Sequence, residues 1–125
     1  MRPPVQAALL LGAALMLVAA ATVNATVAVP HLREDLLELA VRPRLLATVV
    51  LGLHLGTFAL AALAAVVLGE SVKAFRSVEV ARLPLGVIAV TCLVFGIFAF
   101  RATHSHHALG YVAVGALIFA AIARR

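Results

Sequence analysis

Apolar residues along this chain fall into four long runs that are separated by short polar segments. The runs cover about residues 5–25, 45–68, 84–101 and 106–123. A helix of about 20 apolar residues crosses a hydrocarbon core of about 30 Å. We therefore predict an all-α membrane protein, a single integral domain over residues 1–125, in which four transmembrane helices joined by short connections form an antiparallel bundle.

The polar segment between the first two runs has a helical pattern of its own. Residues 30–40 read PHLREDLLELA, with leucines on one side of a helix and most of the charged residues on the other. Pro30 suits a first helical turn and Pro43 ends the pattern. We predict a short amphipathic helix between spans 1 and 2 that lies in the membrane interface or caps the bundle. A solvated helical connector fits the same short stripe.

The first run has two interpretations. Arg2, the apolar run after it and the small residues around Ala25 resemble a signal peptide with a cleavage site. The run is, however, longer than the usual apolar region of a signal peptide, which is about 7–15 residues, and it is sufficient to span a bilayer. On this length argument we expect the segment to be retained as a helix.

Composition and charge exclude a soluble core and disfavour nucleic acid as a partner. Hydrophobic residues make up 65% of the chain and charged residues 12%, and the mean hydropathy is +1.16. The net charge is +5, but the basic residues lie at the ends of the apolar runs, where they meet lipid headgroups. The single cysteine, Cys92, excludes an intrachain disulfide.

The basic residues also predict the topology. Six of them fall on the side that holds both termini, and the other side has four: Arg33, Arg42, Arg44 and Arg101. The positive-inside rule then places both termini in the cytoplasm. The preference for arginine over lysine and the high alanine content are typical of a GC-rich bacterial genome, so we expect a multi-pass protein of a bacterial inner membrane.

His54 is the ionisable residue near the middle of the second run. Gly52 and Gly56 lie on the opposite face, where a small-xxx-small pair allows close helix contact. We predict that this helix packs on both faces and that His54 meets polar partners from the set Thr57, Thr91 and Cys92. Three roles remain open for the imidazole: a polar contact between helices, a proton or substrate site, and a ligand of haem or a metal.

Haem b and transition metals are the cofactors that the histidines suggest. Haem b takes two axial ligands, and Met16 is expected at a depth similar to His54, while two copies of His54 across a homodimer are an alternative. His104, His106 and His107 cluster in the turn between the third and fourth runs and fit a surface site for zinc, copper or nickel. The pattern favours a polar turn without metal over such a site, because no acidic residue or cysteine accompanies the histidines.

No catalytic or nucleotide-binding signature is present, so we do not expect an enzyme acting alone. The sequence favours a binding, accessory or assembly subunit organised around His54, in contact with the lipid bilayer and in a homodimer or a larger membrane complex. The alternatives are a proton-coupled transporter of small solutes in which His54 titrates, and a haem-binding or metal-binding membrane protein.

Overall fold

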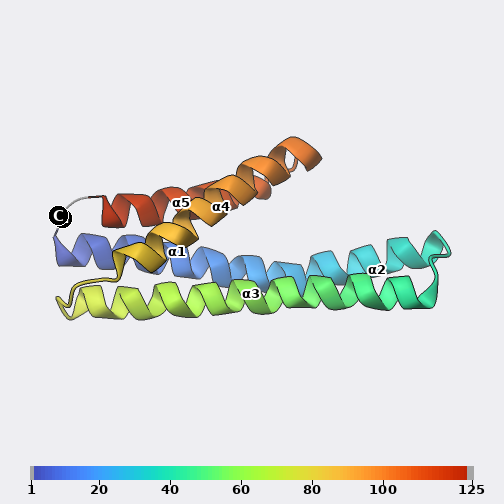
Figure 1. Cartoon of the computed structure of the whole chain (residues 1–125), viewed down its shortest axis with the longest axis horizontal. Helices are drawn as coiled ribbons and strands as arrows, with labels where there is room; N and C mark the ends of the chain where they lie inside the picture. The colour runs from blue at the N-terminus through green and yellow to red at the C-terminus, as the bar shows by residue number, and fades with distance from the viewer. Residues whose placement is uncertain (1, 124–125) are drawn as a thin grey trace.

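The structure, a computed structural model, describes residues 2–123, nearly all of which are helical (Figure 1). The elements in chain order are α1 (Pro3–Val23), the π-helical segment η1 (Asn24–Ala28), α2 (Val29–Glu38), α3 (Pro43–Phe75), α4 (Arg82–Thr103) and α5 (Ala108–Ile122). Because α1, η1 and α2 follow one another without a break, the described residues form four continuous helices and no strand. The predicted four-helix, all-α fold is confirmed.

The amphipathic helix is present as α2, but its connection differs from the prediction. It continues α1 through the wide turn of η1, so that Pro3–Glu38 is one helix of 36 residues. Pro30 is accommodated in the first turn of α2, directly after the π-helical segment, where the backbone hydrogen-bond pattern is already altered. As a result α2 extends along α3, instead of turning away from the first helix (Figure 1).

The helices pack as two hairpins. α1 lies antiparallel to α3, α4 lies against α5, and the contact between α1 and α5 joins the pairs. α3 and α4 diverge from their connection, so the α4–α5 pair crosses the long hairpin at an angle (Figure 1). We term the end with the α3–α4 connection the basal end and the end with the α2–α3 connection the distal end.

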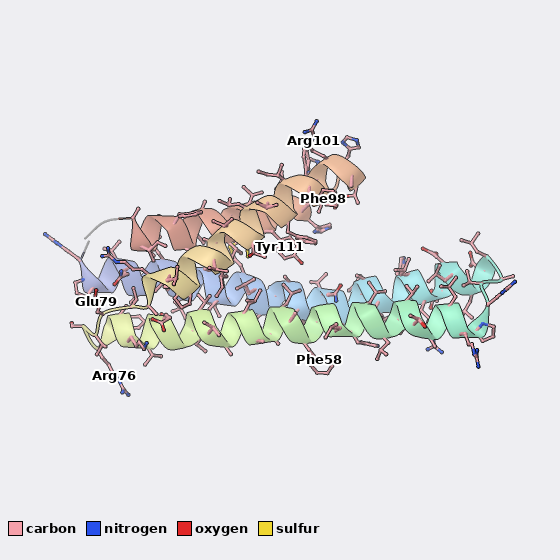
Figure 2. All side chains as sticks on the ribbon, viewed as in Figure 1. Phe58, Arg76, Glu79, Phe98, Arg101 and Tyr111 are labelled. Carbon is pink, nitrogen blue, oxygen red and sulfur yellow. The ribbon has the colours of Figure 1, made fainter. Side chains whose placement is uncertain are left out.

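The core lies in the basal half, around α1. Leu10 and Leu17 of α1 are fully buried, and small residues beside them let the neighbouring helices approach closely. All the buried residues of α3 lie between Ala64 and Ala74. Its distal half has none, so that part of α3 presents an apolar surface on which Phe58 points away from the molecule (Figure 2).

The helix lengths indicate how the molecule fits a bilayer. Within residues 2–123, three helices are long and apolar enough to cross a membrane, whereas α5, with 15 residues, is shorter. α3 has 33 residues and is about 50 Å long, well beyond a hydrocarbon core of about 30 Å. The charged residues of α2 need water or headgroups, so we place the excess length at the distal end, outside the hydrocarbon.

The connections are fixed by backbone and carboxylate contacts. Ala40, Ser77 and His104 follow three helices with φ of 56°, 57° and 53°, in the left-handed region that ends helices. At the basal connection the buried carboxylate of Glu70 accepts the Ala81 N–H at 2.7 Å and the ammonium of Lys73 at 2.9 Å. These bonds tie the start of α4 to the last turns of α3.

Candidate functional site

His54 lies on the exposed face of α3, not between helices. Its neighbours on that face include Leu51, Leu55 and Phe58, with exposed fractions of 70%, 68% and 73%. On the distal side a shallow depression between α2 and α3 is lined by Arg33 as well as His54. Within residues 2–123 the imidazole has no hydrogen-bond partner.

The structure does not bring the expected polar partners to His54. Thr57 Oγ1 instead accepts a hydrogen bond from the side-chain amide of Asn24 at 2.7 Å. The hydroxyl of Thr91 donates to the Val87 carbonyl in its own helix at 2.8 Å. Cys92 is buried and lines a groove that His54 does not reach. The reason is the rotation of α3 about its axis, which turns Gly52 and Gly56, and not His54, toward α4.

Asn24 is the polar residue that joins η1 to α3, and it is not among the site residues predicted from the sequence. Its Nδ2 donates to the Leu53 carbonyl at 3.1 Å as well as to Thr57. The π-helical turn that begins at Asn24 sets the direction of this side chain, and such turns often occur at functional sites. The signal was visible: an amide within a long apolar stretch needs a partner in hydrocarbon.

The haem ligands suggested by the sequence are not brought together. Asn24 bonds to α3 beside Leu53, which fixes the register of the two helices near His54. Met16 lies eight residues before Asn24, about 12 Å along α1, and packs against the core. Met16 and His54 therefore lie at different depths, because the packing of the two long helices places Asn24, and not Met16, beside the residues next to His54.

The histidine-rich turn lies at the far end of the α4–α5 hairpin. His104, His106 and His107 are all exposed. His104 ends α4 in the left-handed conformation, and its ring contacts Phe100 edge-on with centroids 6.3 Å apart. No three metal-ligating side chains gather anywhere in the part of the chain that the structure describes. His104 thus ends α4 through its backbone conformation, a structural role that the sequence pattern did not reveal.

Glycines mediate close helix contact, but at different positions from those expected. A Cβ atom on Gly52 would meet nothing within 4 Å, and one on Gly56 only the Asn24 amide at 3.9 Å. The close contact lies in the α4–α5 hairpin, where Gly96 faces Val112 and Gly115 faces Leu93. Gly52 and Gly56 instead form the floor of an open cavity of about 340 Å³.

We term this cavity the α3–α4 groove. Its lining residues come from four elements and carry no charge: Asn24, Gly52, Leu53, Gly56, Ala59, Leu60, Leu63, Thr91, Cys92, Phe95 and Tyr111. Tyr111 lies on the side of the α4–α5 hairpin that faces the long hairpin (Figure 2). Its ring packs edge-on against Phe95, with centroids 5.1 Å apart.

Two further polar side chains join helices at the basal end. The Gln6 amide donates to the Ala121 carbonyl at 2.9 Å and links α1 to α5. The buried hydroxyl of Ser71 donates to the Ala7 carbonyl at 2.9 Å and links α3 to α1. With Asn24, these residues form hydrogen bonds between helices, which was one of the three roles left open for His54.

Comparison of this chain with known protein families, with curated proteins and with solved structures finds no match.

Proposed function

We propose that this small membrane protein acts by binding, as an accessory or assembly subunit of a larger membrane complex in which His54 lies at the contact. One observation carries the proposal: an imidazole stands on an exposed apolar face of α3 without a hydrogen-bond partner among the described residues. A second protein that offers a donor or an acceptor would provide that partner.

The physical argument depends on where His54 lies along the helix. It is ten residues from Arg44, about 15 Å, and sixteen from Glu70, about 24 Å. The short imidazole side chain therefore does not reach the headgroups from inside the apolar segment, as lysine or arginine can. Lipid tails offer no hydrogen bond, so a polar group exposed to them remains unpaired at a cost. A protein partner removes this cost.

The surroundings of His54 suit a helix interface. Leu51, Leu55 and Phe58 share its face and are largely exposed, so a neighbouring helix can pack over a continuous apolar strip. Without the histidine this strip would be an ordinary lipid-facing surface. The imidazole adds a polar contact that favours one partner over the surrounding lipid.

We also propose a bacterial inner membrane with both termini in the cytoplasm. Arg2, Lys73, Arg76 and Arg82 lie at the basal end, against four basic residues on the other side, so the positive-inside rule favours this orientation only when Arg124 and Arg125 are counted. The two terminal arginines, Arg124 and Arg125, belong to the same count but lie outside the described residues.

The test is the size of the complex that the tagged protein forms when it is extracted from its own membrane in mild detergent. Wild type should migrate well above the 13.0 kDa chain. His54→Leu should lose the complex, whereas His54→Asn, which keeps a donor and an acceptor, should retain part of it. Val66→Ile, a conservative change at an exposed apolar residue of α3 outside this strip, is the control and should behave as wild type.

A complex of unchanged size in His54→Leu would refute the proposal. The absorption spectrum of the same preparation tests the haem hypothesis, because a Soret band that disappears in His54→Leu would assign the residue to a cofactor instead of a protein. Solute uptake that is driven by a proton gradient and is lost in His54→Asn would assign it to transport.

A further inference from the structure

The α3–α4 groove has the shape and polarity of a ligand site, and it does not involve His54. Its volume of about 340 Å³ falls within the range of about 300–1,000 Å³ that is typical of small-molecule sites. Gly52 and Gly56 on its floor leave room that any larger side chain would fill, since a Cβ on Gly52 meets nothing within 4 Å. The divergence of α3 from α4 keeps this space open (Figure 1).

Polar groups gather at the distal part of the groove. Asn24 Nδ2 is used by Leu53 and Thr57, which leaves its Oδ1 as an acceptor without a bond among the described residues. Among residues 2–123 the Tyr111 hydroxyl also has no hydrogen-bond partner. Tyr111 lines the groove as well. The basal part is formed by leucines such as Leu60 and Leu63. Thr91 and Cys92 also line the groove, but the Thr91 hydroxyl is bonded within α4, so the free polar groups lie at one end and the rest is mainly apolar.

The polar end of the groove lies toward the distal turn of the α4–α5 hairpin. Tyr111 is four residues past His107, about 6 Å from the polar turn at the distal end of the α4–α5 hairpin. Tyrosine suits a groove of this polarity, because its ring packs against apolar residues while its hydroxyl offers a hydrogen bond. A molecule that enters from the bilayer would therefore place its head beside Tyr111 and its tail toward the leucines.

We propose that the α3–α4 groove binds an uncharged lipid alcohol, a long-chain molecule with a free hydroxyl at one end. A hydroxyl both donates and accepts, so it can donate to Asn24 Oδ1 and accept from Tyr111. No charged side chain lines the groove, which disfavours a phosphate or ammonium headgroup. A quinone carbonyl only accepts and would leave Asn24 Oδ1 unpaired.

The experiment uses the whole protein in phosphatidylcholine vesicles with a photoreactive long-chain alcohol, and mass spectrometry locates the crosslinks. Gly52→Leu fills the groove floor. Gly69→Leu is the matched control on the same helix, because a Cβ there also meets nothing within 4 Å and Gly69 lies outside the groove. Tyr111→Phe removes the hydroxyl and keeps the ring that packs on Phe95.

Wild type and Gly69→Leu should show saturable crosslinks in the groove, and Gly52→Leu should lose them. Tyr111→Phe should bind about fivefold more weakly, as expected for one lost hydrogen bond. Unlabelled alcohol should compete better than its methyl ether or the matching alkane. Equal competition by the alkane, or crosslinking of Gly52→Leu at the wild-type level, would overturn the proposal. The proposal would also be overturned if two copies of the protein crosslinked through the groove without added alcohol, because a second copy would then occupy it.

Discussion

Two glycines in the α4–α5 hairpin, Gly96 and Gly115, determine how closely these helices approach. A Cβ atom on Gly115 would lie 2.6 Å from Leu93 Cγ and 2.8 Å from the Ala89 carbonyl oxygen. On Gly96 it would lie 2.8 Å from Val112 Cγ2 and 2.9 Å from the Val112 amide nitrogen. Backbone atoms cannot rotate out of the way as the end of a flexible side chain can. Alanine at either position should therefore force α4 and α5 apart.

The magnitude follows from two opposing terms. Overpacking of a tight contact costs about 1–3 kcal/mol, and alanine gains up to about 1 kcal/mol over glycine in helix propensity. Gly115→Ala should therefore lower the free energy of unfolding by about 1–2 kcal/mol, and Gly96→Ala by a similar amount. Gly52→Ala and Gly69→Ala meet nothing within 4 Å, so they should leave stability unchanged or raise it by up to about 1 kcal/mol.

The assay is the temperature at which half of the purified protein aggregates in mild detergent, with helix content measured in parallel by circular dichroism. We expect Gly115→Ala and Gly96→Ala to aggregate at lower temperatures than wild type. Gly52→Ala and Gly69→Ala should aggregate at the same temperature as wild type or a higher one. The reasoning would be refuted if the aggregation temperature of Gly52→Ala fell as far as that of Gly115→Ala while that of Gly69→Ala did not change. It would show that the glycine face of α3 is tightly packed in the intact protein.

Three further predictions concern single sites. Asn24→Leu should lower the free energy of unfolding by about 1 kcal/mol, because it loses the hydrogen bonds to α3. The control Thr22→Val loses only a hydrogen bond within its own helix and should lower it less. Equal aggregation temperatures for the two variants would argue against an interhelical role for Asn24. His104→Gly should raise stability by about 1 kcal/mol, because glycine adopts the left-handed conformation without strain, and a lower aggregation temperature would show that the imidazole itself matters. Ser105→Cys in a Cys92→Ala background should react with an impermeant thiol reagent from outside the cell, and labelling from the cytoplasmic side alone would reverse the topology.

The sequence by itself determined the helices and their approximate ends. Long apolar runs leave the backbone no hydrogen-bond partners in lipid except its own, so they must be helical. Pro43 marks a helix boundary that the structure reproduces, whereas α3 continues to Phe75, past the predicted end of the second run at residue 68. The amphipathic pattern of residues 30–40 was also readable, although its fusion to α1 was not, because Pro30 usually begins a helix and here follows a π-helical turn.

The tertiary structure alone decided which face of each helix packs and therefore which residues form a site. In a helix that is apolar all round, periodicity does not separate the protein-facing side from the lipid-facing side. His54 and Gly52 could each have faced inward, and the rotation of α3 placed the glycine in the groove and the histidine outside. Small-xxx-small spacing marks where helices can approach closely, but the approach occurs at Gly96 and Gly115 because α5 folds back onto α4 there. The position of Asn24 beside Thr57 depends on the register of two helices far apart in sequence, which only their packing fixes.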